Sequence, residues 1–385
     1  MAIGWRSSCA RIALMLALAA GLAMSELRAA DPWKALWISR FEFKTREDVV
    51  AAVANAAKLG CTQLLFQVRG NADAYYASSI EPWGQELGGK DPGFDPLAVA
   101  IAEAEKAGIE VHAWVNVVPG WRGSAPPADR QHVFHAHPEW FLVDQKGQRE
   151  VSRNGYYVAL NPLLPEARAY ICRVMADLCS RYAIDGLHLD YIRFLERPQG
   201  VDYGYDAKTL ALYRQATGKK PQDDAKAWDN WRRAQITALV REIRAVTKRD
   251  GRALPLTAAV ISARSKAHRE LFQDYALWVK EGLVERILPM NYTDSLSEFE
   301  ATLQDILKYV PKEKVATGVG LYKHQDPRRS IEQIFRGGML AKGGVALFSY
   351  EHLFTSPNPE QQKTSEADLV RARRRGAVKA ALKAM

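Results

Sequence analysis

Eight short apolar runs recur along almost the whole chain, and amphipathic segments separate them. Each run has the length and composition of a buried strand, whereas the segments between them carry apolar residues at helical spacing. The strand-like runs are Ala35–Ser39, Thr62–Val68, Glu110–Asn116, Gly186–Tyr191, Leu254–Ile261, Arg286–Tyr292, Val315–Leu321 and Val345–Tyr350. The helical patterns are Arg46–Leu59, Pro96–Ala107, Pro165–Tyr182, Asp224–Lys248, Arg269–Glu281, Ser297–Tyr309 and Pro327–Leu340, with a last helix from about Ser365.

Strands that alternate with helices predict a parallel sheet, because each crossover helix returns the chain to the same end of the sheet. Eight such repeats within 385 residues are enough to close a single-domain (β/α)8 TIM barrel. An open, doubly wound sheet is the alternative. It is disfavoured because no glycine-rich phosphate loop follows the first strand.

Two connections are much longer than the others, Gly70–Asp95 after the second strand and Val117–Pro165 after the third. Both leave strand ends on the side where barrels keep their active sites, and long loops in compact domains are usually functional. Their aromatic side chains have flat faces that suit sugar rings, although the same rings could simply pin the loops to the barrel. These aromatics are Tyr75, Tyr76, Trp83, Trp121, Trp140, Tyr156 and Tyr157.

The N-terminus has the features of an export signal. Arg6 and Arg11 precede the apolar run Ile12–Met24, and the small residues Ala29 and Ala30 follow it. The run is short for a membrane span, so a cleaved signal is predicted, with a retained anchor helix as the alternative. The expected plan is a signal peptide at 1–30, a barrel at 31–360 and a basic helix at 361–385 that closes or trails the barrel, in a periplasmic or secreted protein.

The net charge of +9 is concentrated at the two ends of the chain. The signal contributes three arginines against one glutamate, and residues 363–385 contribute seven basic residues against two acidic ones. The body therefore carries a charge of about +2, which argues against a nucleic-acid-binding surface. The basic tail could make a weak contact with an anionic cell envelope.

Polar side chains gather at the predicted strand ends, which face the pocket in a barrel. Because side chains alternate along a strand, inward residues share parity. This reasoning selects Arg69, Asp73, His112, Trp114, Asn116, His188, Asp190, Arg193, Asn291, Asp294 and Glu351, with Glu42 after the first strand. Such a ring suits glycoside hydrolysis, which needs two carboxyl groups and polar contacts to sugar hydroxyls.

Asp190 is the strongest single candidate. It ends the buried run Asp185–Tyr191, where a carboxylate is costly unless it is paired or used. Arg193 could pair with it, which would make Asp190 a structural residue of the barrel rim instead. No nucleophile elbow, Walker loop or His-Glu-x-x-His motif is present, so no cofactor is expected. His132, His135 and His137 lie close together in a loop, but no metal is expected there.

Several stretches in this order resemble the glycosyl hydrolase-like family ten, barrel enzymes of the cell envelope. They are Gln67–Ala74, Phe94–Leu97, Val111–Asn116, His137–Trp140, Asp185–Tyr191, Gln273–Tyr275 with Trp278, Pro289–Tyr292 and Phe348–Tyr350. The resemblance covers roughly residues 33–354. It implies a glycosidase that acts on a bacterial polysaccharide, with peptidoglycan glycan strands as the expected substrate, and it carries Asp190 over as the catalytic carboxylate.

The family pattern has two consecutive acids at the end of the fourth strand, where this chain has Asp190 followed by Tyr191. The partner carboxylate is therefore open, and the candidates in order are Asp294, Glu351 and Asp73. In this hypothesis Asp190 acts as nucleophile or general acid. The candidate substrate contacts are Arg69, Asp73, His112, Trp114 (stacked on a ring), Asn116, His188, Arg193, Asn291, Tyr292 and Tyr350.

Three other functions stay open at this level. A catalytically silent carbohydrate-binding barrel would keep the aromatic residues without needing Asp190. A deacetylase-like enzyme would need a metal and an Asp/His/His set. A glycosidase acting on an exopolysaccharide would have the same sequence features as one acting on peptidoglycan.

Overall fold

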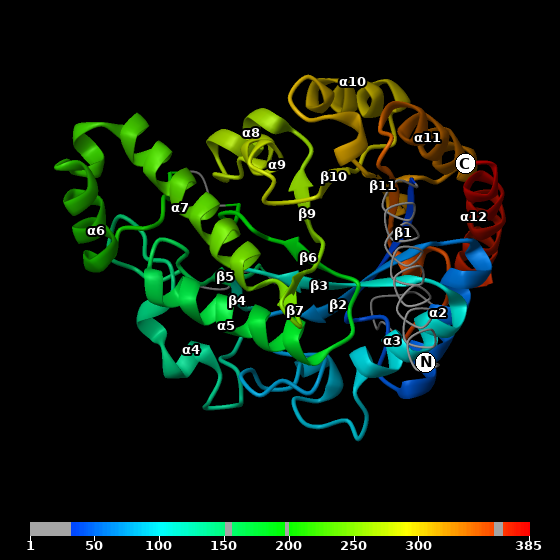
Figure 1. Ribbon diagram of the computed structural model, residues 1–385, viewed down its shortest axis with the longest axis horizontal. Coiled ribbons are helices and arrows are strands. Elements are labelled where there is room, and N and C mark those ends of the chain that lie inside the picture. The colour runs from blue at the N-terminus through cyan, green and yellow to red at the C-terminus, as the bar shows by residue number, and fades with distance from the viewer. Residues whose placement is uncertain (1–31, 151–155, 197–199, 358–364) are drawn as a thin grey trace, which may run out of the picture.

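Eight parallel strands close into a barrel in the computed structural model, which describes residues 32–150, 156–196, 200–357 and 365–385 (Figure 1). The closed barrel confirms the predicted (β/α)8 fold and excludes the open sheet. Around the barrel the strands follow the order β1, β2, β3, β6, β9, β10, β11, β12. Their bounds are β1 Trp33–Ile38, β2 Gln63–Arg69, β3 Glu110–Asn116, β6 Gly186–Asp190, β9 Leu256–Ile261, β10 Arg286–Asn291, β11 Thr317–Gly320 and β12 Gly344–Phe348. The expected signal peptide lies outside the described residues.

The helices between the strands match the predicted patterns closely. Short-range signals in the sequence set their ends: Thr45 forms a capping box at the start of α2, and Gly60 and Gly108 end α2 and α3 in the left-handed conformation. The main helices are α2 Arg46–Leu59, α3 Pro96–Ala107, α5 Pro165–Arg181, α7 Ala225–Val246, α9 Tyr275–Lys280, α10 Leu296–Leu307, α11 Pro327–Leu340 and α12 Ser365–Ala384.

The barrel interior is filled by side chains of alternate strand positions. Trp33, Ala35 and Trp37 of β1 point inward and pack with Trp114 of β3, while the intervening positions pack against the helices. This interior also contains Leu65, Leu288, Ala316 and Ala346. The barrel is therefore a packed core, and a ligand can reach only its open ends.

The C-terminal helix α12 packs against α11 and α2, the helices on either side of the seam between β12 and β1 (Figure 1). Two of its arginines face inward: Arg374 donates to the carbonyls of His324 and His352, and Arg375 donates to that of Leu353. Arg373 is exposed. Arg374 and Arg375 are thus engaged in the fold, whereas Lys379 and Lys383 are exposed like Arg373.

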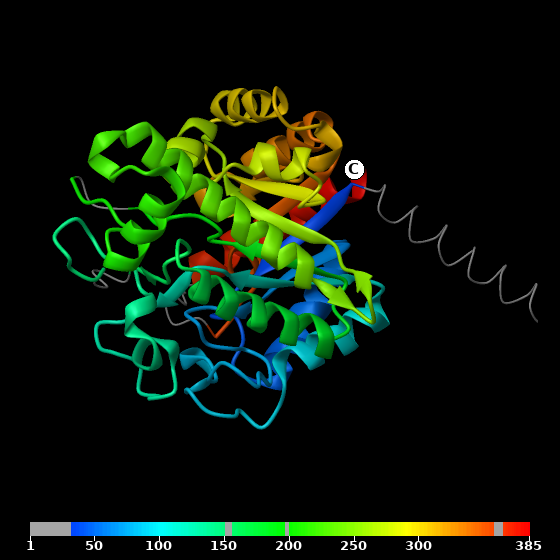
Figure 2. The same ribbon diagram turned by 60° about the vertical axis from the view of Figure 1, so that its left-hand side comes forward.

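The described parts of the chain differ from the predicted pattern in several places, including the short strand pairs β4 (Pro119–Trp121) with β5 (Val158–Ala159) and β7 (Lys248–Arg249) with β8 (Arg252–Ala253). A helix that the pattern omitted, α6 (Ala207–Thr217), extends to one side of the barrel with the start of α7 (Figures 1 and 2). The predicted helix Arg269–Glu281 is interrupted, because Phe272 takes a left-handed backbone (φ +55°) and Asp274 caps a new helix. The earlier part of that segment belongs to α8 (Arg264–Arg269).

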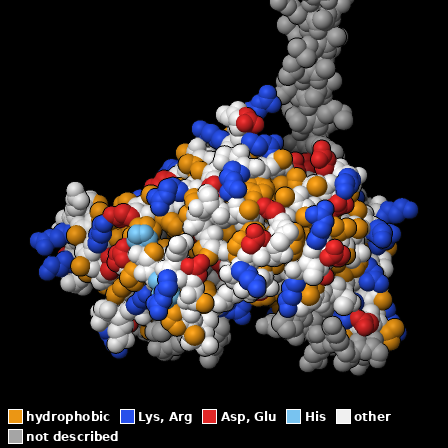
Figure 3. Space-filling view, turned by 90° about the horizontal axis from the view of Figure 1, so that it is seen from below, with side chains coloured by type: hydrophobic (Ala, Val, Ile, Leu, Met, Phe, Trp, Pro, Cys, Tyr) orange, Lys and Arg blue, Asp and Glu red, His pale blue; other side chains and the backbone are white. Residues whose placement is uncertain are grey.

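Acidic and basic side chains are interspersed on the face seen in Figure 3. That mixture has no single-sign stripe of the kind nucleic-acid-binding surfaces carry. Among the described residues, no helix is long and apolar enough to cross a membrane.

Candidate functional site

Asp190 ends β6 and faces the mouth of the barrel at the carboxyl ends of the strands. Only 6% of the residue is exposed, and its Oδ1 accepts the backbone N–H of Tyr191 at 2.7 Å. Burial raises the pKa of this carboxyl to about 6, although the charge of Arg193 and the Tyr191 N–H oppose the rise. A carboxyl that titrates near neutral pH can give or take a proton under physiological conditions.

Two unpartnered polar side chains lie on the strand next to Asp190. Asn116 pairs with Asp190 in the β3–β6 register, and neither Nδ2 nor Oδ1 of its amide has a partner within the described protein. The indole Nε1 of Trp114, one inward position below, has no partner at full hydrogen-bonding geometry, but it lies close enough to the Asp190 carboxyl to lower the pKa of that group. Buried groups of this kind are normally satisfied by water or a ligand. The structure thus brings Asp190, Asn116 and Trp114 together, with hydrogen-bonding capacity left over.

One wall of the mouth consists of residues that follow β6, a tyrosine of the long loop after β3 and an arginine that follows β1. Tyr191 has a left-handed backbone (φ +52°), which is strained for a large side chain. Its ring packs edge-on against Tyr157 at 5.1 Å, and Arg193 lies over it at 4.7 Å. Arg40 donates to the Tyr157 hydroxyl at 3.4 Å. Sequence reasoning named Arg193 and Tyr157 but missed Tyr191 and Arg40, whose positions depend on the turn after β6 and on the end of β1.

The opposite wall is a cluster of aromatic rings. Tyr292 stacks on Phe348 at 5.3 Å, and Tyr322 meets both rings edge-on. The rings fit because β11 carries glycine there: a Cβ on Gly320 would lie 2.9 Å from Tyr292. Burial raises the pKa of Tyr292, and the charge of Asp190 raises it further, so the two side chains are close enough to interact. Tyr292 was predicted at the site, whereas Phe348 and Tyr322 were not.

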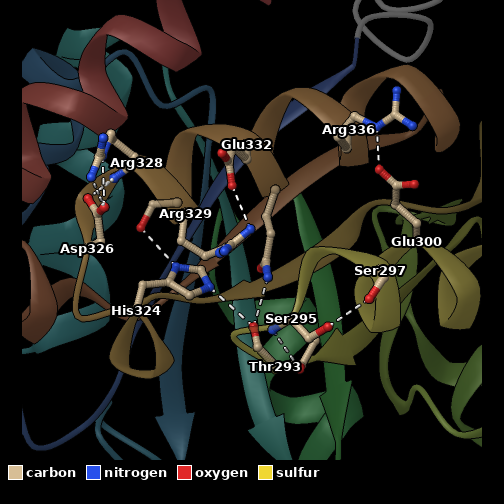
Figure 4. A network of polar contacts seen from close by, with 12 residues as sticks. Thr293, Ser295, Ser297, Glu300, His324, Asp326, Arg328, Arg329, Glu332 and Arg336 are labelled. Atoms are coloured by element: carbon tan, nitrogen blue, oxygen red, sulfur yellow. Dashed lines mark hydrogen bonds and ion pairs between the residues drawn. The ribbon is translucent and has the colours of Figure 1, made fainter.

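Asp294 lies on the loop between β10 and α10 and is exposed. The loop is held by its neighbour Thr293, whose carbonyl accepts from His324 at 3.3 Å and from Gln333 at 2.8 Å (Figure 4). His324 is itself held by Ser330. These contacts fix the base of the loop and leave the Asp294 carboxylate in solvent.

Glu351, the second candidate partner, lies just after β12 in the short turn Tyr350–His352 and is half-buried. Its backbone N–H donates to Oε1 of Glu42 at 2.9 Å, and Oε2 of Glu42 accepts the Ser39 N–H at 2.6 Å. Burial raises the pKa of Glu42 to about 8, and the Glu351 charge adds to that rise. The raised pKa favours the neutral form of Glu42, which joins the ends of β1 and β12 beside Glu351.

Arg69 is a correction to the predicted contacts. It is fully buried, and its guanidinium binds Glu81 at 2.8–3.0 Å and the carbonyls of Asn116 and Val117. Tyr170 also donates to Glu81, at 2.7 Å. The N–H donors of Arg69 are thus directed into the protein, and they fix the end of β3. The side chain therefore cannot reach a sugar.

His112 and His188 have the predicted inward parity but lie too deep. The ring of His112 packs against Trp33, the first residue of β1, at 4.6 Å, so it belongs to the opposite end of the barrel. Trp37 donates to Nε2 of His188 at 3.2 Å, so Nδ1 must carry the proton given to Thr257 at 2.9 Å. Burial keeps the pKa of His188 well below its usual range. His188 is a neutral core residue beneath Asp190.

Asn291 and Tyr350 point away from the barrel mouth. Asn291 donates to the carbonyl of Phe299 in α10 at 2.8 Å, and the hydroxyl of Tyr350 accepts from Asn55 in α2 at 2.8 Å. Both side chains therefore attach a strand end to a covering helix. Their prediction as substrate contacts is wrong, since Asn291 has the outward parity of β10.

The three histidines of the long loop after β3 each contact a different part of the protein. His132 contacts the carbonyl of Asn71, His135 that of Pro127, and His137 stacks on Trp140 at 3.6 Å. In the part of the chain that the structure describes, no group of three or more His, Cys, Asp or Glu side chains could hold a metal ion.

The profile of the family described as Glycosyl hydrolase-like 10 matches residues 32–335. Glycosyl hydrolase YngK of Bacillus subtilis is 27% identical over an alignment of 286 positions that covers 68% of this chain and 51% of that protein. Glycosyl hydrolase DigH of Escherichia coli K12 is 26% identical over an alignment of 305 positions that covers 71% of this chain and 65% of that protein. The chain therefore spans about half to two-thirds of the length of these relatives.

Solved structures share the fold. The glycoside hydrolase domain of PgaB (BpsB) from Bordetella bronchiseptica has a TM-score of 0.61 at 13% identity and covers 88% of this chain and 98% of its own. Alpha-L-fucosidase isoenzyme 2 from Paenibacillus thiaminolyticus also has a TM-score of 0.61, at 14% identity, and covers 92% of this chain and 49% of its own. At such low identity the likeness is one of barrel architecture.

Proposed function

Because the chain belongs to the glycosyl hydrolase-like 10 family, we propose that it hydrolyses glycosidic bonds in a polysaccharide, with Asp190 at the centre of the reaction. The observation that carries the proposal is the setting of Asp190: a buried carboxyl with a pKa of about 6 beside the unpartnered amide of Asn116. Fold alone would not assign a function, since barrels host many chemistries.

The walls of the mouth suit a sugar. Tyr292, Phe348 and Tyr322 offer ring faces and edges on one side, and Tyr157 and Tyr191 do so on the other. Asn116 and Arg193 supply donors for hydroxyl or acetamido oxygens. Trp114 contributes an indole N–H from below.

The chemistry needs a second carboxyl group. We favour Glu351 over Asp294, because Glu351 is half-buried at a strand end while Asp294 is exposed on its loop. One carboxyl would protonate the departing oxygen, and the other would attack the anomeric carbon or activate a water. Glu42 would act as a positioning residue, since its carboxyl holds the backbone of Glu351 at 2.9 Å.

The substrate we propose is the glycan strand of peptidoglycan, and the setting is the periplasm or the cell exterior. Two features support this: the resemblance to cell-envelope barrel enzymes, and the signal-like N-terminal pattern of Arg6, Arg11 and the apolar run after them.

Product analysis by mass spectrometry tests the function. Purified protein would be incubated with peptidoglycan glycan strands, both intact and stripped of stem peptides. Release of short sugar fragments is the expected result. If the protein binds the strands but leaves them uncleaved after long incubation, it is instead a carbohydrate-binding barrel.

A further inference from the structure

A second cavity, of about 260 Å³, opens between the two long loops that follow β2 and β3. It lies on the same end of the barrel as Asp190, because both loops leave the carboxyl ends of their strands. Its lining residues are Asp73, Pro82, Trp83, Gln85, Gly88, Gly89, Trp121, Pro127, Ala128, Asp129 and His132.

Arg40 connects this cavity to the barrel mouth. It is buried, binds Glu86 at 3.1 Å and donates to Tyr157 of the mouth at 3.4 Å. Its charge also acts on Asp73, which lines the cavity and is 2% exposed. The cavity and the Asp190 site are therefore neighbours, joined through Arg40 and Tyr157, and one long ligand could occupy both.

The cavity presents the groups that recognise a sugar ring. Trp83 and Trp121 supply apolar surface, and the Trp121 N–H is already used on the carbonyl of Ala125 at 2.8 Å. The Asp73 carboxyl is held by the N–H of Asn71 at 2.6 Å, so it is oriented in advance to accept hydroxyl groups. Gly88 and Gly89 have left-handed backbones, and a Cβ on either would meet nothing within 4 Å, so this rim is open.

The charges of the lining select the kind of sugar. Asp73 and Asp129 are acidic, and the described residues that line the cavity include no lysine or arginine. His132 accepts the Phe134 N–H through Nδ1, and burial lowers its pKa to about 4, so it is neutral at physiological pH. An acidic sugar would find no basic side chain in the lining to pair with, since the nearby Arg40 is engaged with Glu86 and acts on Asp73. A volume below that of typical drug-sized sites fits one ring.

We propose that this cavity is an additional subsite that binds one neutral sugar residue of the polysaccharide at a distance from Asp190. The proposal rests on the proposed function. In a peptidoglycan glycan it would take N-acetylglucosamine, because N-acetylmuramic acid carries a carboxylate. With such a subsite, the protein would bind a long polysaccharide chain with higher affinity than a short one.

Calorimetric titration of the full chain carrying Asp190→Asn tests the subsite, with the linear tetramer of N-acetylglucosamine as the probe. Ala128→Trp would fill the cavity from its exposed rim, and Trp83→Ala would remove one aromatic face. Ala128→Ser is the matched control for the first change. Trp231→Ala, a partly buried tryptophan on α7, is the control for the second.

We expect both cavity variants to weaken binding roughly tenfold and both controls to leave it unchanged. Ala128 is exposed, so the protein should tolerate a tryptophan there. Unchanged tetramer affinity in Ala128→Trp would therefore overturn the proposed subsite. Absence of tetramer binding by the Asp190→Asn parent would also overturn it. Neither result bears on hydrolysis, which is judged separately from the fragments that the unsubstituted chain releases.

Discussion

Replacing Glu81 by glutamine should destabilise the protein strongly, although the residue lies away from Asp190. Glu81 and Arg69 form an ion pair at 2.8 Å in which both side chains are fully buried. The substitution keeps the shape but removes the negative charge, which leaves the Arg69 guanidinium buried without its counter-ion. Breaking one partner of a buried pair lowers the free energy of unfolding by about 3–5 kcal/mol.

The Arg69–Glu81 pair also joins the long loop after β2 to the end of β3. Arg69 donates to the carbonyls of Asn116 and Val117, and Tyr170 of α5 donates to Glu81. We therefore expect Glu81→Gln to disturb Asn116, the neighbour of Asp190, and to lower glycan affinity as well as stability. The glutamine amide retains one acceptor for Tyr170, which places the loss at the lower end of that range.

Urea unfolding followed by circular dichroism measures the effect. The matched control is Glu281→Gln, which breaks the bidentate pair with Arg241 on the surface, where the two side chains are 48% and 32% exposed. Solvent screens that pair, so the control should lose no more than about 1 kcal/mol. Equal losses for the two variants, or a loss below 1 kcal/mol for Glu81→Gln, would refute the assignment of Arg69 as a structural cation.

Two further predictions concern Asp190 and α12. Asp190→Asn should stabilise the protein by up to about 3 kcal/mol above pH 6, because the folded state raises this pKa from 3.8 to about 6. The unfolded carboxyl is largely protonated only below about pH 3, so the urea midpoints of parent and variant should converge there. A constant difference across this range would contradict the raised pKa. Arg374→Ala should lower the free energy of unfolding by about 2–3 kcal/mol, because the carbonyls of His324 and His352 lose a charged donor, whereas Arg373→Ala should stay within about 0.5 kcal/mol. Similar urea midpoints for these two variants would show that α12 does not anchor the loops.

Sequence periodicity predicted the barrel well because the signals are local. The apolar runs and the helical spacing act within a few residues. The structure adds helix caps at Thr45 and Asp95 and glycines after α2 and α3, which are equally local. The interruption at Phe272 was not predictable, since a left-handed backbone at a phenylalanine depends on its packing.

The candidate site was predicted less completely, because the sequence does not give the position of each side chain along the barrel axis. Alternation identifies which side chains face inward, but it does not say how far along the barrel axis each one lies. Asp190 ends its strand and reaches the mouth, whereas His188 lies one layer below and His112 at the far end. Residues placed by loops, such as Tyr191, Tyr322 and Arg40, depend on tertiary contacts that no local pattern encodes.

The central claim is that Asp190 carries the reaction, and a turnover comparison tests it most directly. The parent chain and Asp190→Asn would be incubated with peptide-free glycan strands, and the sugar fragments quantified by mass spectrometry over time. The Asp190→Asn protein should remain folded and bind the strands, yet release fragments at least about a hundredfold more slowly, as expected when an acid–base or nucleophilic group is lost. Equal rates of release by the two proteins would contradict the account and place the chemistry on other residues.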